Sequence, residues 1–173
     1  MIKTERIYLR KFREDDIDLL FQLDGDTDVM KYITLGVART MYEVIEKSMP
    51  RILKSYQKHS DLGIYAAYLK NSDEYVWWFQ FERDKELKDA IEIGWRLKKQ
   101  HWGNGYATEV AIALSEMGME KGKIIVARAM IENLASIRVM EKAGLEFEKQ
   151  FWGDYEPHSG KPDVLYQRQL TTW

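Results

Sequence analysis

The segment Trp102-Gly103-Asn104-Gly105-Tyr106-Ala107 is the part of the sequence best suited to bind a phosphate. It lies between a strand-like segment, Ala90 to Leu97, and an amphipathic helix expected to begin near Ala107. Glycine adopts positive φ easily and leaves the backbone unshielded, and the first N–H groups of a helix have no partner within the helix. An anion is therefore stabilised at this turn by unpaired N–H groups and by the positive end of the helix dipole.

Three kinds of phosphate ligand use such a turn, and the residues around it separate them. A nucleoside triphosphate loop requires Gly-Lys-Ser/Thr at the helix start, whereas Ala107-Thr108 stands here. A dinucleotide fingerprint, Gly-x-Gly-x-x-Gly, matches at Gly103 and Gly105 but has Thr108 in place of the third glycine. Glu132, at the end of the next strand, would be its ribose-binding acid, so this reading stays as an alternative. The third ligand is coenzyme A, whose pyrophosphate fits the same turn.

Four segments, in order along the chain, form a pattern that extends beyond this turn: Thr4-Glu5-Arg6-Ile7-Tyr8-Leu9-Arg10, Ile91-Glu92-Ile93-Gly94-Trp95, Tyr106-Ala107-Thr108-Glu109, and the block from Asn133 to Leu145. In these segments the chain resembles the GNAT superfamily of acetyl-CoA-dependent N-acetyltransferases, in particular the branch that includes ribosomal-protein N-terminal alanine acetyltransferases. The glycine motif of that family, Gln/Arg-x-x-Gly-x-Gly/Ala, can be aligned with the segment from Gln100 to Gly105 or with the segment from Trp102 to Ala107. The second placement is preferred because it puts Gly105 and Ala107 at the mouth of the helix.

The resemblance implies an α/β (α+β) fold, the GNAT fold. Its mixed, twisted seven-stranded sheet carries helices on both faces, with a V-shaped split between central strands where coenzyme A lies. Residues 1–173 would form a single GNAT domain, and this length lies within the usual single-domain range of roughly 50–250 residues. Thr40-Met41-Tyr42-Glu43 is a capping box, and Pro50 is expected to kink or split the helix that follows it. The resemblance also implies a first strand at 4–10. The sequence pattern then predicts a helix at 17–21, a helix from 41, and an antiparallel meander at 62–69, 75–81 and 90–97. After the meander it predicts a helix ending near 122, a strand at 124–130, a helix at 134–143 and two strands around 153–162.

Acetyl transfer to an amine requires a proton acceptor for the amine and hydrogen-bond donors for the thioester carbonyl. Glu92, a charged residue in an otherwise apolar strand, is the candidate general base, acting directly or through water; a solvent-facing strand residue is the alternative. The resemblance implies that backbone N–H groups of Trp95, Arg96 and Leu97 hold the carbonyl and the pantetheine arm. His158, in a later loop, is a second candidate base.

The helix expected at 134–143 is the candidate to stabilise the leaving thiolate of coenzyme A. Many relatives carry a tyrosine seven residues after the asparagine that opens this helix, and Met140 stands at that position here. In the branch that the chain resembles, a serine takes the role, which implies Ser136, while Asn133 either bonds the pantetheine amides or serves as a helix N-cap. Arg138 and Lys142, four residues apart, would face the 3′-phosphate, unless they are ordinary solvated charges.

The co-substrate is therefore expected to be acetyl-CoA, with no metal ion. The residues expected to bind it are Trp95, Arg96, Leu97, Trp102, Gly103, Asn104, Gly105, Tyr106, Ala107, Thr108, Asn133, Ser136, Arg138 and Lys142.

The acceptor is expected to be a primary amine, either on a small molecule or at a protein N-terminus. Trp77 and Trp78 stand where relatives often have glycine, and one of them is expected to crowd the acceptor pocket while the other lies in the core. Asp24, Asp26 and Asp28 would attract a cationic acceptor. The two tryptophans and Met140 also motivate an alternative function, a catalytically silent module that binds coenzyme A or a peptide.

Composition excludes several other classes. The chain has no cysteine, so a thiol nucleophile and a disulfide framework are excluded. The formal net charge is −2, which gives no basic footprint for nucleic acid. No stretch approaches the ~20 apolar residues of a membrane span, so no membrane partner and a cytoplasmic location are expected. A homodimer is left open.

Overall fold

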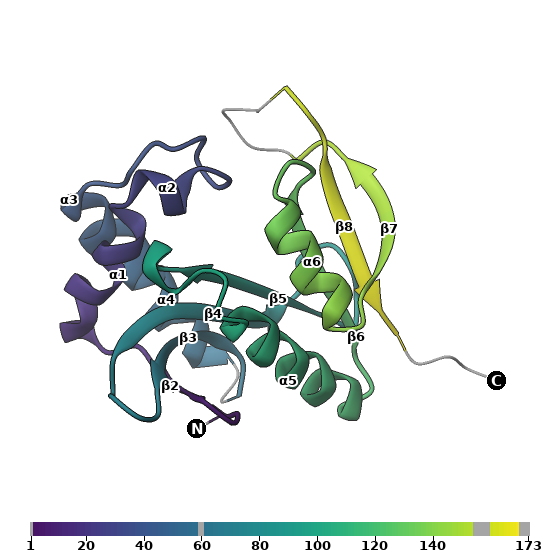
Figure 1. Ribbon diagram of the computed structural model, residues 1–173, viewed down its shortest axis with the longest axis horizontal. Coiled ribbons are helices and arrows are strands. Elements are labelled where there is room, and N and C mark those ends of the chain that lie inside the picture. The colour runs from purple at the N-terminus through teal and green to yellow at the C-terminus, as the bar shows by residue number, and fades with distance from the viewer. Residues whose placement is uncertain (1, 59–60, 154–159, 170–173) are drawn as a thin grey trace.

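The computed structural model describes residues 2–58, 61–153 and 160–169, which fold around one mixed sheet of eight strands (Figure 1). The spatial order is β1-β2-β3-β4-β5-β6-β8-β7. The bounds are β1 Ile2–Lys3, β2 Ile7–Lys11, β3 Gly63–Leu69, β4 Tyr75–Arg83, β5 Ala90–Leu97, β6 Ile124–Met130, β7 Glu146–Phe151 and β8 Asp163–Arg168. The sheet has one strand more than the seven expected, because the two residues of β1 pair with β2.

The two ends of the sheet differ from the sequence prediction. Strand β2 begins at Ile7, and the residues before it form a turn in which the Thr4 N–H donates to the Ile7 carbonyl at 2.9 Å. The last two strands, β7 and β8, lie on either side of the segment 153–162 in which they were expected. His158 lies outside the described residues.

The split between central strands is confirmed by the pairing of β5 with β6. These strands are parallel and pair only at Ala90 with Ile124, Ile91 with Ile125 and Glu92 with Val126. Beyond this point β5 stays paired with β4, and β6 stays paired with β8. The two strands therefore separate toward their carboxyl ends, and side chains or a ligand must fill the gap.

Helices cover both faces of the sheet, as predicted (Figure 1). On one face α5 (Tyr106–Glu120) and α6 (Leu134–Lys142) bury Val110, Leu114 and Met140 against the sheet. On the other face the core includes Leu20 and Leu23 of one helix. The helices of that face are α1 Ile17–Asp24, α2 Thr27–Met30, α3 Met41–Glu43 and α4 Met49–Lys58. None of the described helices is both long and apolar enough to cross a membrane.

The capping box and the effect of Pro50 are both confirmed. The Thr40 hydroxyl accepts from the Glu43 N–H at 3.2 Å, and the Glu43 carboxylate accepts from the Thr40 N–H at 3.0 Å. Residues Val44–Ser48 are π-helical, and α4 begins one residue before Pro50. Proline lacks an N–H and cannot continue the α-helical ladder, so the wider turn lies directly before it.

A buried ionic network joins the helices of this face to β5. Asp24, the last residue of α1, is 1% exposed, and its carboxylate accepts from Arg96 of β5, from Arg39 at 3.3 Å and from Ser48 at 3.2 Å. The Arg96 guanidinium also lies over the Trp78 ring, 4.7 Å from its centroid. The network thus fixes the position of α1 relative to the strand that borders the split.

We expect Asp24→Asn to lower the free energy of unfolding by about 3 kcal/mol, because it leaves the buried Arg96 without its counter-ion. Asp28→Asn is the matched control, since Asp28 is half-exposed and pairs with the exposed Lys99. Urea unfolding of both variants measures the difference. Equal stability of the two variants would contradict a structural role for the Asp24–Arg96 pair.

Candidate active site

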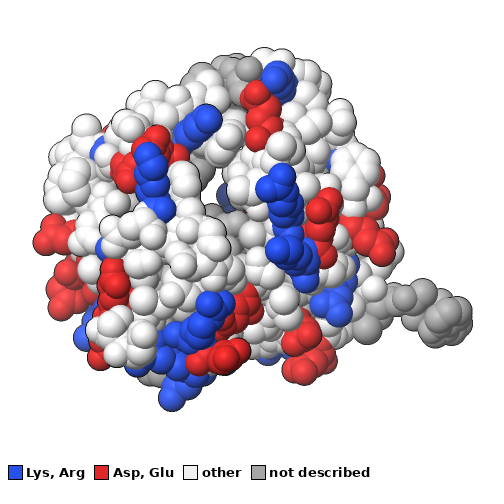
Figure 2. Space-filling view, viewed as in Figure 1, with Lys and Arg blue, Asp and Glu red and all other residues white. Residues whose placement is uncertain are grey.

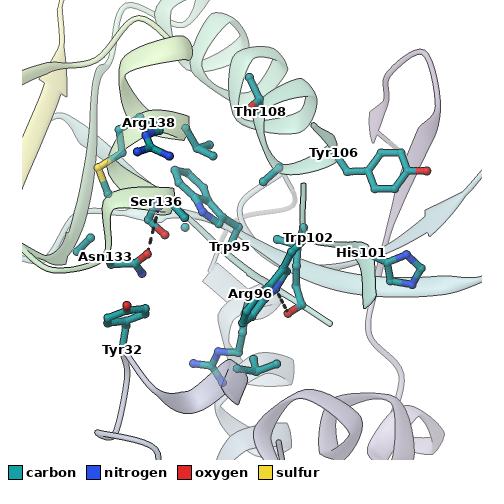
Figure 3. A pocket seen from close by; sticks show the side chains of 18 of the residues that line it. Tyr32, Trp95, Arg96, His101, Trp102, Tyr106, Thr108, Asn133, Ser136 and Arg138 are labelled. Carbon is teal, nitrogen blue, oxygen red and sulfur yellow. Dashed lines mark hydrogen bonds between the residues drawn. The ribbon is translucent and has the colours of Figure 1, made fainter. Parts of the chain in front are cut away.

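A cavity of about 440 Å³ occupies the split between β5 and β6. It reaches from the α5 and α6 face of the sheet to α2 and the residues after it on the other face (Figure 3). Strand β5 contributes Ile93 to Leu97, which include the expected Trp95, Arg96 and Leu97. Because β6 has left this edge, the backbone N–H and C=O groups of β5 have no partner strand on that side among the described residues. An extended polar ligand can bond to this edge.

The glycine turn borders one end of the cavity. Gly103 and Gly105 have φ of +79° and +76°, values that favour glycine, and α5 begins at Tyr106, one residue earlier than expected. The first-turn N–H groups of α5 therefore face the turn, as a phosphate site requires. The cavity is lined here by Trp102, Gly103, Gly105, Tyr106, Ala107 and Thr108.

Two residues of this turn have structural contacts that the sequence did not reveal. The Trp102 indole donates to the Leu97 carbonyl at 3.0 Å, so it ties the turn to the end of β5. The exposed Asn104 donates its side-chain amide to the Trp102 carbonyl at 3.2 Å. Asn104 does not line the cavity with its side chain, which shapes the turn, and its expected contact with the cofactor stays a prediction.

Helix α6 contributes the third wall. The Asn133 side chain accepts from the Ser136 N–H at 3.2 Å, which confirms its N-cap role, and both residues line the cavity (Figure 3). Arg138 and Lys142 line it as well, and Figure 2 shows Lys and Arg side chains along α6 beside a hollow. Met140 is buried and lines the inner wall, so no acidic hydroxyl occupies the tyrosine position of the family.

Glu92 lies next to the cavity and does not line it. Its carboxylate accepts from the Gln80 side chain at 2.8 Å and from Arg128 at 3.2 Å. Burial raises the pKa of Glu92, and Arg128 and Gln80 oppose that rise. Since alternate residues of a strand share a face, Glu92 lies on the same face of β5 as Gly94, which does line the cavity.

Arg128 is the polar residue of this site that the sequence prediction missed. It lines the cavity from β6 and reaches across β5 to bond Glu92, Glu86 at 3.4 Å and the buried Asp84. It therefore joins β6 to β5 and to the loop that follows β4, at the point where the split begins. A charged residue within the apolar run of β6 was the available signal, the same signal that identified Glu92.

The acceptor end of the cavity is less acidic than expected. Of Asp24, Asp26 and Asp28, only Asp28 lines the cavity, and it pairs with Lys99 at 2.6 Å. Asp24 is buried in its network, and the Asp26 carboxylate caps α2 by accepting the N–H groups of Asp28 and Val29. The prediction that all three attract the acceptor is therefore wrong for Asp24 and Asp26. Val29, Tyr32 and Ile33 complete this end.

The paired tryptophans do not crowd the acceptor end. Trp77 is fully buried in the core on the α5 side of the sheet, and Trp78 is buried on the opposite side beneath Arg96. Neither lines the cavity. Glu132, the acid required for a dinucleotide, forms an ion pair with Lys161 at 2.7 Å and does not line the cavity. This removes the support for the dinucleotide alternative.

Comparison with known proteins identifies the family. A family model described as an acetyltransferase (GNAT) domain matches residues 6–146. The chain belongs to the GNAT acetyltransferase family. A curated relative, the uncharacterized N-acetyltransferase p20 of Bacillus licheniformis, is 27% identical over 96% of this chain and 93% of its own. A crystal structure of a GNAT-family acetyltransferase from Bacillus anthracis is 28% identical, covers 97% of both chains and has a TM-score of 0.77.

The expected branch is also represented among similar structures. The ribosomal L7/L12 alpha-N-protein acetyltransferase RimL, solved in complex with coenzyme A, has a TM-score of 0.78 and covers 96% of both chains. At 19% identity this likeness concerns the fold. The predicted activity, transfer of an acetyl group from acetyl-CoA to an amine, is confirmed by family membership. In the described part of the chain, His, Asp and Glu form no group of three or more that would hold a metal ion.

Proposed function

We propose that the cavity binds acetyl-CoA in an extended form and presents its thioester to an amine that enters from the α2 end. The supporting observation is that one cavity joins the glycine turn on one face to Tyr32 and Ile33 on the other, through the split. The pyrophosphate would lie on the N–H groups of residues 103–108. The pantetheine arm would follow the free edge of β5, and Arg138 with Lys142 would hold the 3′-phosphate.

The proposed chemistry is direct attack of the amine on the thioester carbon. Glu92 takes the proton of the ammonium, directly or through a water molecule, because it lies just beyond the cavity wall and burial makes it more basic than an ordinary glutamate. A new C–N bond forms, and the carbonyl oxygen becomes an oxyanion that N–H groups of β5 stabilise. The C–S bond then breaks as the carbonyl re-forms, coenzyme A leaves as a thiolate that accepts a hydrogen bond from the Ser136 hydroxyl, and the second proton of the new amide nitrogen passes to the solvent.

The position of Ser136 supports the enzyme over the silent binding module. Met140 leaves the tyrosine position apolar, which favours the silent module. However, Ser136 lines the cavity at the first turn of α6, next to the Asn133 that caps the helix. A hydroxyl is thus present on the wall that borders the proposed pantetheine path, and the enzyme is the better supported proposal.

For the acceptor, the lining supports selection by shape more than by charge. Asp28 is already paired with Lys99, and Val29, Tyr32 and Ile33 present apolar and aromatic surface. A small-molecule amine and a protein N-terminus both fit this description. The cytoplasmic location and the homodimer stay predictions.

We expect acetyl-CoA to raise the melting temperature of the protein with increasing concentration, because a ligand that binds only the native state stabilises it. With acetyl-CoA present, a panel of small amines and N-terminal peptides should contain at least one acceptor that releases free coenzyme A. No thermal shift at millimolar acetyl-CoA would contradict the proposed site. A shift without release by any acceptor would favour the silent module.

We expect Glu92→Gln to lower kcat by about 10²- to 10⁴-fold with acetyl-CoA affinity unchanged, which is the usual size of general-base catalysis. Glu82→Gln is the matched control, because Glu82 is the cross-strand neighbour of Glu92 on β4 and pairs with Arg51. Its activity should stay close to that of the unaltered protein. Turnover of Glu92→Gln at the unaltered rate, measured below the pKa of the acceptor amine, would exclude Glu92 as the base.

The pH profile provides a second readout of the same assignment. Glu92 accepts a proton only when ionised, so kcat/KM should fall as the pH drops through its raised pKa. Gln80→Leu removes a hydrogen bond that favours the charged form, and the acid limb should therefore move to higher pH. An unmoved acid limb would mean that another group sets it.

A further inference from the structure

Tyr106, the first residue of α5, borders the cavity, and its ring packs against other parts of the protein. Its ring points away from Trp95, Ser136 and Arg138, the side chains grouped on the other side of the site (Figure 3). The ring stacks on the buried Trp77, with centroids 5.3 Å apart and planes at 21°. The Arg6 guanidinium lies over the same ring, 4.6 Å from the centroid. Tyr106 is thus held between a core tryptophan and an arginine from the other end of the sequence.

Arg6 also bonds the glycine turn and the first turn of α5. Its Nη1 donates to the Asn104 carbonyl at 3.1 Å, and its Nε donates to the Glu109 carboxylate at 2.6 Å. Glu109 lies in the first turn of α5 and receives two further bonds, from the Arg6 N–H at 2.8 Å and from the Thr4 hydroxyl at 2.5 Å. The turn that precedes β2 therefore clamps the glycine turn and the start of α5 from outside.

We propose that Arg6 and Glu109 are positioning residues for the pyrophosphate of acetyl-CoA, which hold the glycine turn in its binding shape without touching the cofactor. This inference rests on the proposed cofactor site. Neither residue lines the cavity, and both bond residues at its border. Arg6 lies over the ring of Tyr106 and bonds the carbonyl of Asn104, and the Glu109 N–H donates to the Gly105 carbonyl at 3.0 Å. A turn fixed before the ligand arrives loses less conformational freedom on binding, which strengthens affinity.

The direction in which the affinity for coenzyme A changes distinguishes a positioning role from a direct effect of charge. Glu109 is a carboxylate in the helix turn that would receive an anion, so by charge alone Glu109→Gln should bind coenzyme A more tightly. If Glu109 instead holds Arg6 and the turn, the same change should weaken binding. We expect about a tenfold increase in the Kd of coenzyme A, as loss of a charge-assisted hydrogen bond implies.

The experiment measures the Kd of coenzyme A by calorimetry for the unaltered protein and three variants. Arg6→Lys keeps the positive charge but cannot bond Glu109 and Asn104 together, and it should show a similar loss to Glu109→Gln. Lys3→Gln is the control, since Lys3 is an exposed cation on the adjacent β1, and its Kd should not change. Tighter binding by Glu109→Gln, or unchanged binding by Arg6→Lys, would overturn the proposal.

A second readout excludes a general loss of structure. S-acetylpantetheine, a donor without the pyrophosphate, should react equally well with the unaltered protein and with both clamp variants, Glu109→Gln and Arg6→Lys. With acetyl-CoA the variants should show a raised KM and an unchanged kcat. Equal losses with both donors would overturn the positioning role. Failure of the unaltered protein to bind coenzyme A would instead refute the proposed function.

Discussion

The short parallel pairing of β5 with β6 is the constraint on which the site depends. Three residue pairs join the strands, and beyond Glu92 and Val126 each strand keeps only its outer partner. Buried backbone groups must find hydrogen-bond partners, so the separated edges form a site that a polar, extended molecule can complete. The place where these strands separate therefore sets the position of the cavity, of the glycine turn at its mouth and of Glu92 beside it.

Polar clusters hold each side of the split in place. At the point where the strands separate, Arg128 bonds Glu92 of β5 and Asp84, the residue that follows β4. On the acceptor side Asp24 fixes α1 to Arg96 of β5. Hydrophobic packing is not directional, whereas these charged groups bond in defined geometries, and they lie where the sheet itself provides no pairing. Glu92, the proposed base, is thus also one of the residues that hold this part of the sheet together.

Local patterns predicted the elements that border the cavity well. The apolar run of β6 fixed its bounds at Ile124–Met130, and the glycine turn and the Asn133 cap stand where the sequence places them. The edges were predicted poorly for a physical reason. Strand β1 has two residues, too few for a period, and most of β7 is exposed, so its sequence lacks the alternation of a half-buried strand.

Roles that depend on distant partners could not be read from the sequence. In the sequence Asp24 looks like a solvated charge, because its partner Arg96 is distant along the chain. In the same way the sequence predicts that one of Trp77 and Trp78 crowds the acceptor pocket, because the packing of Trp77 on Tyr106 joins residues that are distant along the chain. Residue type indicated that these positions were unusual, and only the fold showed what they contact.

Hydrogen exchange with and without coenzyme A tests the central claim most directly, namely that the separated edge of β5 and the glycine turn form one binding site. We expect slower amide exchange in two segments, residues 93–97 and 103–109, with β7 as an unaffected internal reference. Protection of both segments at the same coenzyme A concentration is the predicted result. Binding of coenzyme A without protection of residues 93–97 would contradict the account, because the cofactor would then lie outside the split.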